Sequence, residues 1–170
     1  MRVLTFSRFY PAYHPKKGKP TFFVEKIVNG LNQITNAGVE VHENVDFNLE
    51  LYYLCDPKFH TIRAGSRWKV GDWFSPRVWS DKPYRSKQIE FAPPIQVKKV
   101  WPITIRPHKE HGFVIHIKDR YVADWEGTAN ITQSELAKND GLEKDDLLRW
   151  FRVPKPFTGQ IICWNENINY

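Results

Sequence analysis

Short apolar stretches separated by turn residues fill most of the chain after residue 58. Proline, glycine or aspartate stands between several of them, as expected where strands end. A sheet of many short strands has exposed edges that invite pairing with other chains, and closing the sheet removes those edges. The pattern therefore predicts a closed or nearly closed β-barrel with strands at residues 59–63, 73–79, 89–91, 95–105, 113–117, 122–125 and 160–164, and a first strand is expected at residues 3–7.

Helical patterns precede and follow these strands. Residues 21–34 place their apolar side chains at the spacing of one helical face. Thr132 and Glu135 resemble a capping box, which predicts a helix from that point, and a second helix is expected over residues 143–151. Residues 48–55 fit a helix or a strand. The chain is thus predicted to be an α+β protein, a β-barrel with an N-terminal helix and a late helical pair.

Length and composition fit one folded domain over residues 1–170, in which residues 1–57 pack with the rest. The hydrophobic content of 41% is enough for a core. No apolar stretch approaches the ~20 residues that span a bilayer, so we expect a cytoplasmic protein with no membrane contact. Cys55 and Cys163 have no metal-binding spacing and fit a reduced pair, although a disulfide between them stays open.

Positive charge is concentrated in one part of the sequence. The formal net charge is +6, and residues 58–109 carry twelve lysines and arginines against three acidic residues. Such a field suits a polyanionic partner, RNA or DNA, but it also suits a surface that only keeps the protein in solution. Charge by itself leaves both interpretations open.

The most informative motif is Lys58-x-x-Thr61-Ile-Arg63, followed by Gly71-Asp72. Side chains alternate along a strand, so Thr61 and Arg63 are expected on one face. Lys58 lies just before that strand, where a bend can bring it to the same place. A hydroxyl, an ammonium and a guanidinium together suit an anionic or carbonyl-bearing ligand.

This motif resembles the signature of ASCH domains, small β-barrels of the PUA-like superfamily. The late segment, with its Asp140-Gly141 step and closing Trp150-Phe151, resembles the late helix of that family, so the likeness covers roughly residues 58–164. Some ASCH enzymes are amidohydrolases that deacetylate N4-acetylcytidine with a lysine, a threonine and a glutamate. The resemblance implies Thr61 as nucleophile, Lys58 as base and Asp140 in place of the glutamate.

The resemblance also implies binding of RNA or of a modified nucleotide, because PUA-like domains generally bind such ligands. Trp68 lies in a polar turn and is the predicted stacking residue, whereas the spacing of Trp73 and Trp79 favours an interior face. The proline-rich loop of residues 8–19 is either a mobile surface loop or a segment that closes over a ligand. The predicted binding residues are Lys58, Thr61, Arg63, Arg67, Trp68, Lys69, Arg85, Lys87, Arg8, Lys16 and Lys17.

Three functional hypotheses follow. The first is nucleic-acid binding, the second is a metal-independent amidohydrolase acting on an N-acylated cytosine nucleoside, and the third is a protein-interaction module. We expect no metal, because His108-x-x-His111 lacks a third ligand nearby. We expect no cofactor either, because the glycines form no phosphate-binding pattern.

Overall fold

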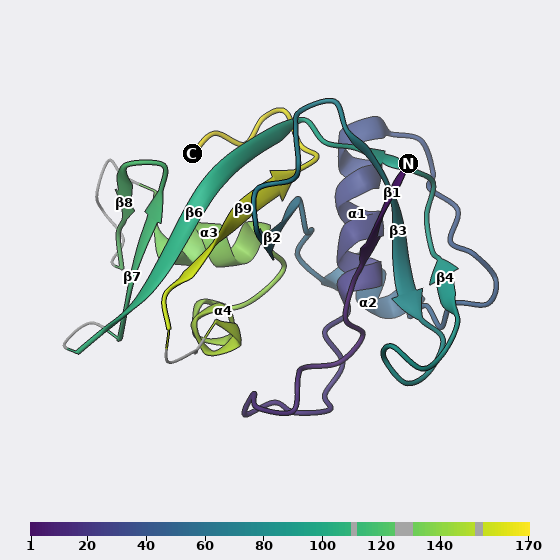
Figure 1. The fold of residues 1–170 in the computed structure, drawn as a ribbon. Coiled ribbons are helices and arrows are strands. Elements are labelled where there is room, and N and C mark those ends of the chain that lie inside the picture. Colours follow the sequence, from purple (N-terminus) through teal and green to yellow (C-terminus); the bar gives the residue numbers. More distant parts are fainter. Residues whose placement is uncertain (110–111, 125–130, 152–154) are drawn as a thin grey trace.

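The structure is a computed structural model that describes residues 1–109, 112–124, 131–151 and 155–170. Over these residues it is an α+β fold with four helices and two β-sheets (Figure 1). Trp125, the last residue of a predicted strand, and His111 lie outside the described residues. The α+β class predicted from the sequence is confirmed.

The first sheet is mixed. β1 (Arg2–Thr5) lies parallel to β3 (Trp73–Trp79), so the start of the chain pairs with a strand some seventy residues later. β4 (Gln88–Glu90) and β5 (Ile95–Gln96) both pair with β3 in the antiparallel sense. β3 is therefore the strand that organises this sheet.

The second sheet is antiparallel throughout. Its order is β2 (His60–Ala64), β9 (Phe157–Cys163), β6 (Lys99–His108), β7 (Gly112–Ile117) and β8 (Arg120–Val122). Alternate residues of β6 are buried, and they face buried isoleucines of β7 across the register. The period of two in the sequence thus becomes one apolar face of this sheet.

The predicted single barrel is wrong, because the described strands form two separate sheets that do not close on each other. The chain leaves β2 in the antiparallel sheet and enters β3 in the mixed sheet, and the partners of β3 all belong to the mixed sheet. Aromatic rings fill the space between the sheets: Trp164, just after β9, packs on Phe6 and Phe74 with ring centroids 6.3 and 5.9 Å apart.

The helices form where the sequence predicts them. α1 (Phe23–Thr35) buries its apolar face, and α2 (Leu49–Leu54) settles the open choice at residues 48–55 in favour of a helix. Thr132 caps α3 (Gln133–Asn139) by accepting a hydrogen bond from the Glu135 amide, and α4 (Lys144–Trp150) follows after a short turn.

Both cysteines are free thiols, so the structure contains no Cys55–Cys163 disulfide. Among the described residues no helix is long and apolar enough to cross a membrane. The buried apolar residues form one cluster that draws on both sheets and on α1, α3 and α4.

Candidate active site around Lys58

The backbone before β2 is held against two helices, and this places Lys58. Its amide donates to the Lys26 carbonyl of α1 at 2.8 Å, and the next amide, that of Phe59, donates to the Asn139 carbonyl of α3 at 2.9 Å. Gly30 allows the approach of α1, because a Cβ there would stand 2.6 Å from the Lys58 carbonyl oxygen. Lys58 is therefore fixed where α1, α3 and β2 meet.

Asp140 meets Lys58 at the end of α3. Lys58 Nζ donates to Asp140 Oδ1 at 2.9 Å and also to the Asp140 backbone carbonyl. The following residue, Gly141, has a φ of +73°, and a Cβ there would lie 3.1 Å from Lys58 Cβ. The Asp-Gly step thus turns the chain and leaves room for the lysine stem.

The pair is enclosed. The side chain of Lys58 is 1% exposed and that of Asp140 is 8% exposed. Burial lowers the pKa of Lys58 to about 8, even though the Asp140 carboxylate opposes the change. For Asp140, burial favours the neutral acid, but Lys58 and His60 outweigh it and the pKa falls below its usual value. The ammonium also lies 4.4 Å from the centre of the Phe23 ring.

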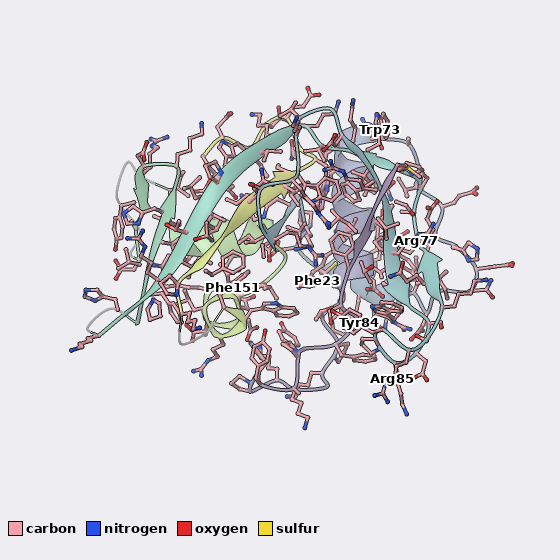
Figure 2. All side chains as sticks on the ribbon, viewed as in Figure 1. Phe23, Trp73, Arg77, Tyr84, Arg85 and Phe151 are labelled. Atoms are coloured by element: carbon pink, nitrogen blue, oxygen red, sulfur yellow. The ribbon has the colours of Figure 1, made fainter. Side chains whose placement is uncertain are left out.

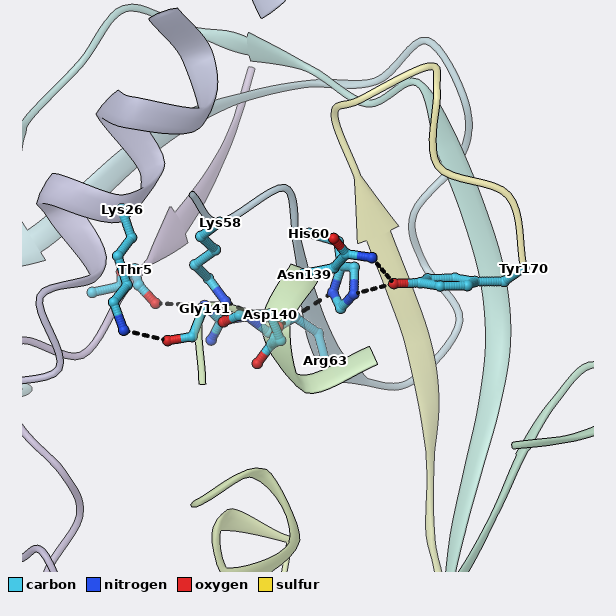
Figure 3. A network of polar contacts seen from close by, with 9 residues as sticks. All are labelled: Thr5, Lys26, Lys58, His60, Arg63, Asn139, Asp140, Gly141 and Tyr170. Carbon is cyan, nitrogen blue, oxygen red and sulfur yellow. Dashed lines mark hydrogen bonds and ion pairs between the residues drawn. The ribbon is translucent and has the colours of Figure 1, made fainter. Parts of the chain in front are cut away.

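Figure 3 shows the site as a row of side chains from α1 to the end of the chain. Lys26 donates to the Gly141 carbonyl at 2.7 Å on one side of Lys58. On the other side His60 Nδ1 lies 3.3 Å from Asp140 Oδ1, and His60 Nε2 lies 2.8 Å from the Tyr170 hydroxyl. Asp140 is therefore contacted from both sides.

Thr61 and Arg63 share one face of β2, opposite the face of His60. Arg63 donates to the Thr5 carbonyl at 2.9 Å and lies over the Phe6 ring, and its charge acts on both Lys58 and Asp140. Thr61 is buried at 5% exposure, on the face of the strand that Arg63 shares.

The predicted nucleic-acid residues do not gather at this site. Trp68, the predicted stacking residue, is wrong in that role, because its side chain is buried at 3% exposure against Phe74. Trp73 was expected inside and is instead 50% exposed. The reason is local: the turn after β2 folds back over the sheet, and the Gln160 side chain hydrogen-bonds the Trp68 backbone.

The remaining basic residues that were predicted to bind nucleic acid lie in three separate places. Arg67 and Lys69 are exposed before β3, whereas Arg85 and Lys87 are exposed after it. The length of β3 separates the two pairs by roughly 20 Å. The third group belongs to the loop of residues 8–19 and its surroundings: Arg8 pairs with Asp46 at 2.9 Å, Lys16 pairs with Asp146, and Lys17 is exposed.

The loop of residues 8–19 packs on α4. Asp146 of α4 receives Lys16 Nζ at 2.5 Å and the Tyr10 hydroxyl at 3.1 Å, and His14 Nε2 lies 3.7 Å from it. The Tyr10 ring packs on Trp150, 5.7 Å between centroids. These contacts hold the loop on α4, and the choice between a mobile surface loop and a segment that closes over a ligand stays a prediction.

The sequence did not point to His60, Tyr170 or Phe23 as neighbours of Lys58. His60 lies inside the motif, but nothing local indicates its contact with a tyrosine 110 residues away. Phe23 is part of the apolar face of α1 and reads as an ordinary core residue. Among the described residues no group of three or more His, Cys, Asp or Glu side chains could hold a metal ion, and His111 lies outside them.

Comparisons with models of known families, with curated proteins and with solved structures found no match to this chain. The functional argument therefore depends on the residues of the site.

Proposed function

We propose that this chain is an ASCH-like amidohydrolase in which Thr61 is the nucleophile and Lys58 the base. The observation that carries the proposal is the burial of Lys58, with its pKa lowered to about 8, beside a carboxylate and just before the strand that bears Thr61. At neutral pH about one Lys58 in ten is then unprotonated, compared with about one in a few thousand for an ordinary lysine.

The proposed reaction has two stages. Thr61 Oγ1 attacks the acyl carbon while its proton passes to Lys58 Nζ, and the C–N bond breaks as the leaving amine takes that proton. Water then attacks the acyl-threonine, releases the carboxylic acid and returns the hydroxyl. Asp140 keeps Lys58 in place throughout. Arg63, on the face of Thr61, can stabilise the oxyanion that forms on the acyl oxygen.

The resemblance to ASCH domains supplies the substrate class, an N4-acylated cytosine nucleoside. The test is turnover of N4-acetylcytidine to cytidine, followed by liquid chromatography. We expect product with the unmutated chain and none with Thr61→Ala. Thr158→Ala, which removes an exposed hydroxyl from β9 of the same sheet, is the matched control and should keep full activity. An active Thr61→Ala protein would exclude Thr61 as the nucleophile.

A second candidate function, binding of a single-stranded nucleic acid, is supported by the surface along β3. Trp73 is 50% exposed and Tyr84 is 89% exposed, and Figure 2 shows them at different levels of the mixed sheet, with Arg77 between and Arg85 beyond Tyr84. A groove of about 450 Å³ lies beside β3 and β4, lined by His42, Asn44, Arg77, Lys87, Gln88, Ile89 and Glu90. Exposed rings with flanking bases suit stacked nucleotides and their phosphates.

Binding of a labelled oligonucleotide at several salt concentrations tests this second function. Affinity should fall as salt rises, because each neutralised phosphate releases counterions. Trp73→Ala should weaken binding about tenfold through lost stacking. Arg120→Ala, an exposed charge on β8 of the other sheet, should have a much smaller effect. Equal affinity of the Trp73→Ala and unmutated proteins would rule out this surface.

A further inference from the structure

A line of buried polar side chains leads from Asp140 to Tyr170 (Figure 3). His60 is 0% exposed and lies between them, with Nδ1 3.3 Å from Asp140 Oδ1 and Nε2 2.8 Å from the Tyr170 hydroxyl. Asn139 Nδ2 donates to the same hydroxyl oxygen at 2.8 Å. The Trp101 ring packs against Tyr170, 5.0 Å between centroids, and helps to fix the phenol.

The direction of each proton follows from the charge of Asp140. The carboxylate beside Lys58 is ionised and can only accept. His60 Nδ1 lies 3.3 Å from it without the alignment of a hydrogen bond, and hydrogen on Nδ1 is the protonation state that this approach favours. Burial lowers the pKa of His60, so the ring is neutral and Nε2 is an acceptor. The Tyr170 hydroxyl then donates to Nε2 and accepts from Asn139. Each group has one role, and the roles are mutually consistent.

We propose that His60 and Tyr170 are positioning residues: Tyr170 fixes the tautomer and orientation of His60, and His60 holds the Asp140 carboxylate against Lys58. Their importance for turnover rests on the proposed hydrolase function. The arrangement itself does not, because it follows from contacts between buried groups. Without this support the Asp140 carboxylate is freer to turn away from Lys58 Nζ. The positive charge on Lys58 is then less well stabilised.

Other charged groups also act on this line and must be separated from it. They are Lys26 of α1, Arg63 of β2, Glu135 of α3 and Cys163 of β9. Burial lowers the pKa of Lys26 as well, so the two lysine signals need separate assignment. Lys26→Arg and Lys58→Arg variants would identify the signals in a spectrum of lysine-labelled protein.

The first test uses the unmutated protein without substrate. Nitrogen chemical shifts of labelled histidine distinguish the two neutral tautomers of His60 from the charged ring. We expect hydrogen on Nδ1 and a bare Nε2 at pH 7. Hydrogen on Nε2, or a charged ring at that pH, would overturn the proposal. This measurement needs no variant to fold and no activity to be present.

The second test measures the Lys58 titration by NMR in Tyr170→Phe. A loosened Asp140 supports the Lys58 ammonium less, so the pKa of Lys58 should fall, with at least about a threefold change in its protonation constant. Tyr10→Phe is the matched control, because it removes a buried tyrosine hydroxyl that donates to Asp146 instead. The control should leave Lys58 unchanged. An unchanged Lys58 in Tyr170→Phe would refute the positioning role.

These outcomes are separate from those of the proposed function. If N4-acetylcytidine and related amides are not turned over while the predicted tautomer and Lys58 shift are found, the hydrolase proposal fails and the positioning proposal stands. If turnover depends on Thr61 but Tyr170→Phe leaves the Lys58 titration and the pH profile of turnover unchanged, the hydrolase proposal stands and the positioning proposal fails.

Discussion

Two aspartates of the late helical pair gather the same types of side chain at different depths. Each has a lysine, a histidine and a tyrosine nearby: Lys58, His60 and Tyr170 around Asp140, and Lys16, His14 and Tyr10 around Asp146. The Lys58 side chain is 1% exposed, whereas that of Lys16 is 45% exposed. The chemical composition of the clusters is alike, and their access to water differs.

That difference gives the two pairs different electrostatic properties. In the Asp140 cluster burial removes the lysine from water, so the pKa of Lys58 falls to about 8, as the proposed role of a base requires. In the Asp146 cluster the lysine is half in water, and the contacts serve to hold the loop of residues 8–19 on α4. The two clusters therefore differ in burial and not in residue type.

The largest contrast is expected when each lysine is replaced by methionine. Lys58→Met leaves the Asp140 carboxylate buried without its partner and should lower the free energy of unfolding by about 3–5 kcal/mol. Lys16→Met removes a partly exposed ion pair and should cost less than about 1 kcal/mol. Urea unfolding of both variants measures the difference, and equal losses would contradict the comparison.

The pH dependence of stability should show the same contrast at smaller size. A lysine with a folded pKa of about 8 and an unfolded pKa near 10.4 binds fewer protons in the folded state between these values. Lys58 therefore makes the protein more stable as pH rises from about 8 to about 10.4, by about 2–3 kcal/mol.

The measurement is the difference in unfolding free energy between the unmutated protein and Lys58→Met, followed across that pH window. The subtraction removes the opposite contributions of Tyr10 and Cys163, because burial raises the pKa of both. A difference that stays flat from pH 8 to 10.4 would show that Lys58 titrates as an ordinary exposed lysine.

The smallest effect is expected from Asp146→Asn. The variant weakens the bonds from Lys16 and Tyr10, so the loop of residues 8–19 should open more often while the rest of the fold is kept. Amide hydrogen exchange in that loop should become about tenfold faster, which corresponds to about 1.4 kcal/mol. Asp140→Asn is the matched change in the other cluster and should leave loop exchange unchanged; a similar acceleration there would mean that the two clusters are not independent.

Local signals in the sequence were enough for most elements of the fold. The apolar spacing in α1 and the cap at Thr132 gave helices where they are found, and β3 matches its predicted residues. The two-sheet arrangement could not be predicted in this way. It depends on β1 pairing in parallel with β3, and no residue of either strand carries a local mark of that distant partner.

The candidate site was predictable to a similar extent. The motif and its family resemblance indicated Lys58, Thr61 and Asp140, and the structure brings Lys58 and Asp140 to 2.9 Å. His60 and Tyr170 were missed because their contact spans 110 residues. Trp68 was misplaced because a polar neighbourhood in the sequence does not reveal that the turn folds back onto the core.

The titration of Lys58 itself tests the central claim most directly. NMR of lysine-labelled protein, with the signal assigned through Lys58→Arg, would give its pKa in the absence of substrate. A midpoint near 8 is the result that the account predicts, because burial lowers the pKa of Lys58 by more than the Asp140 carboxylate raises it. A midpoint near the ordinary lysine value, about 10.4, would mean that water reaches Nζ and that Lys58 is not poised as a base.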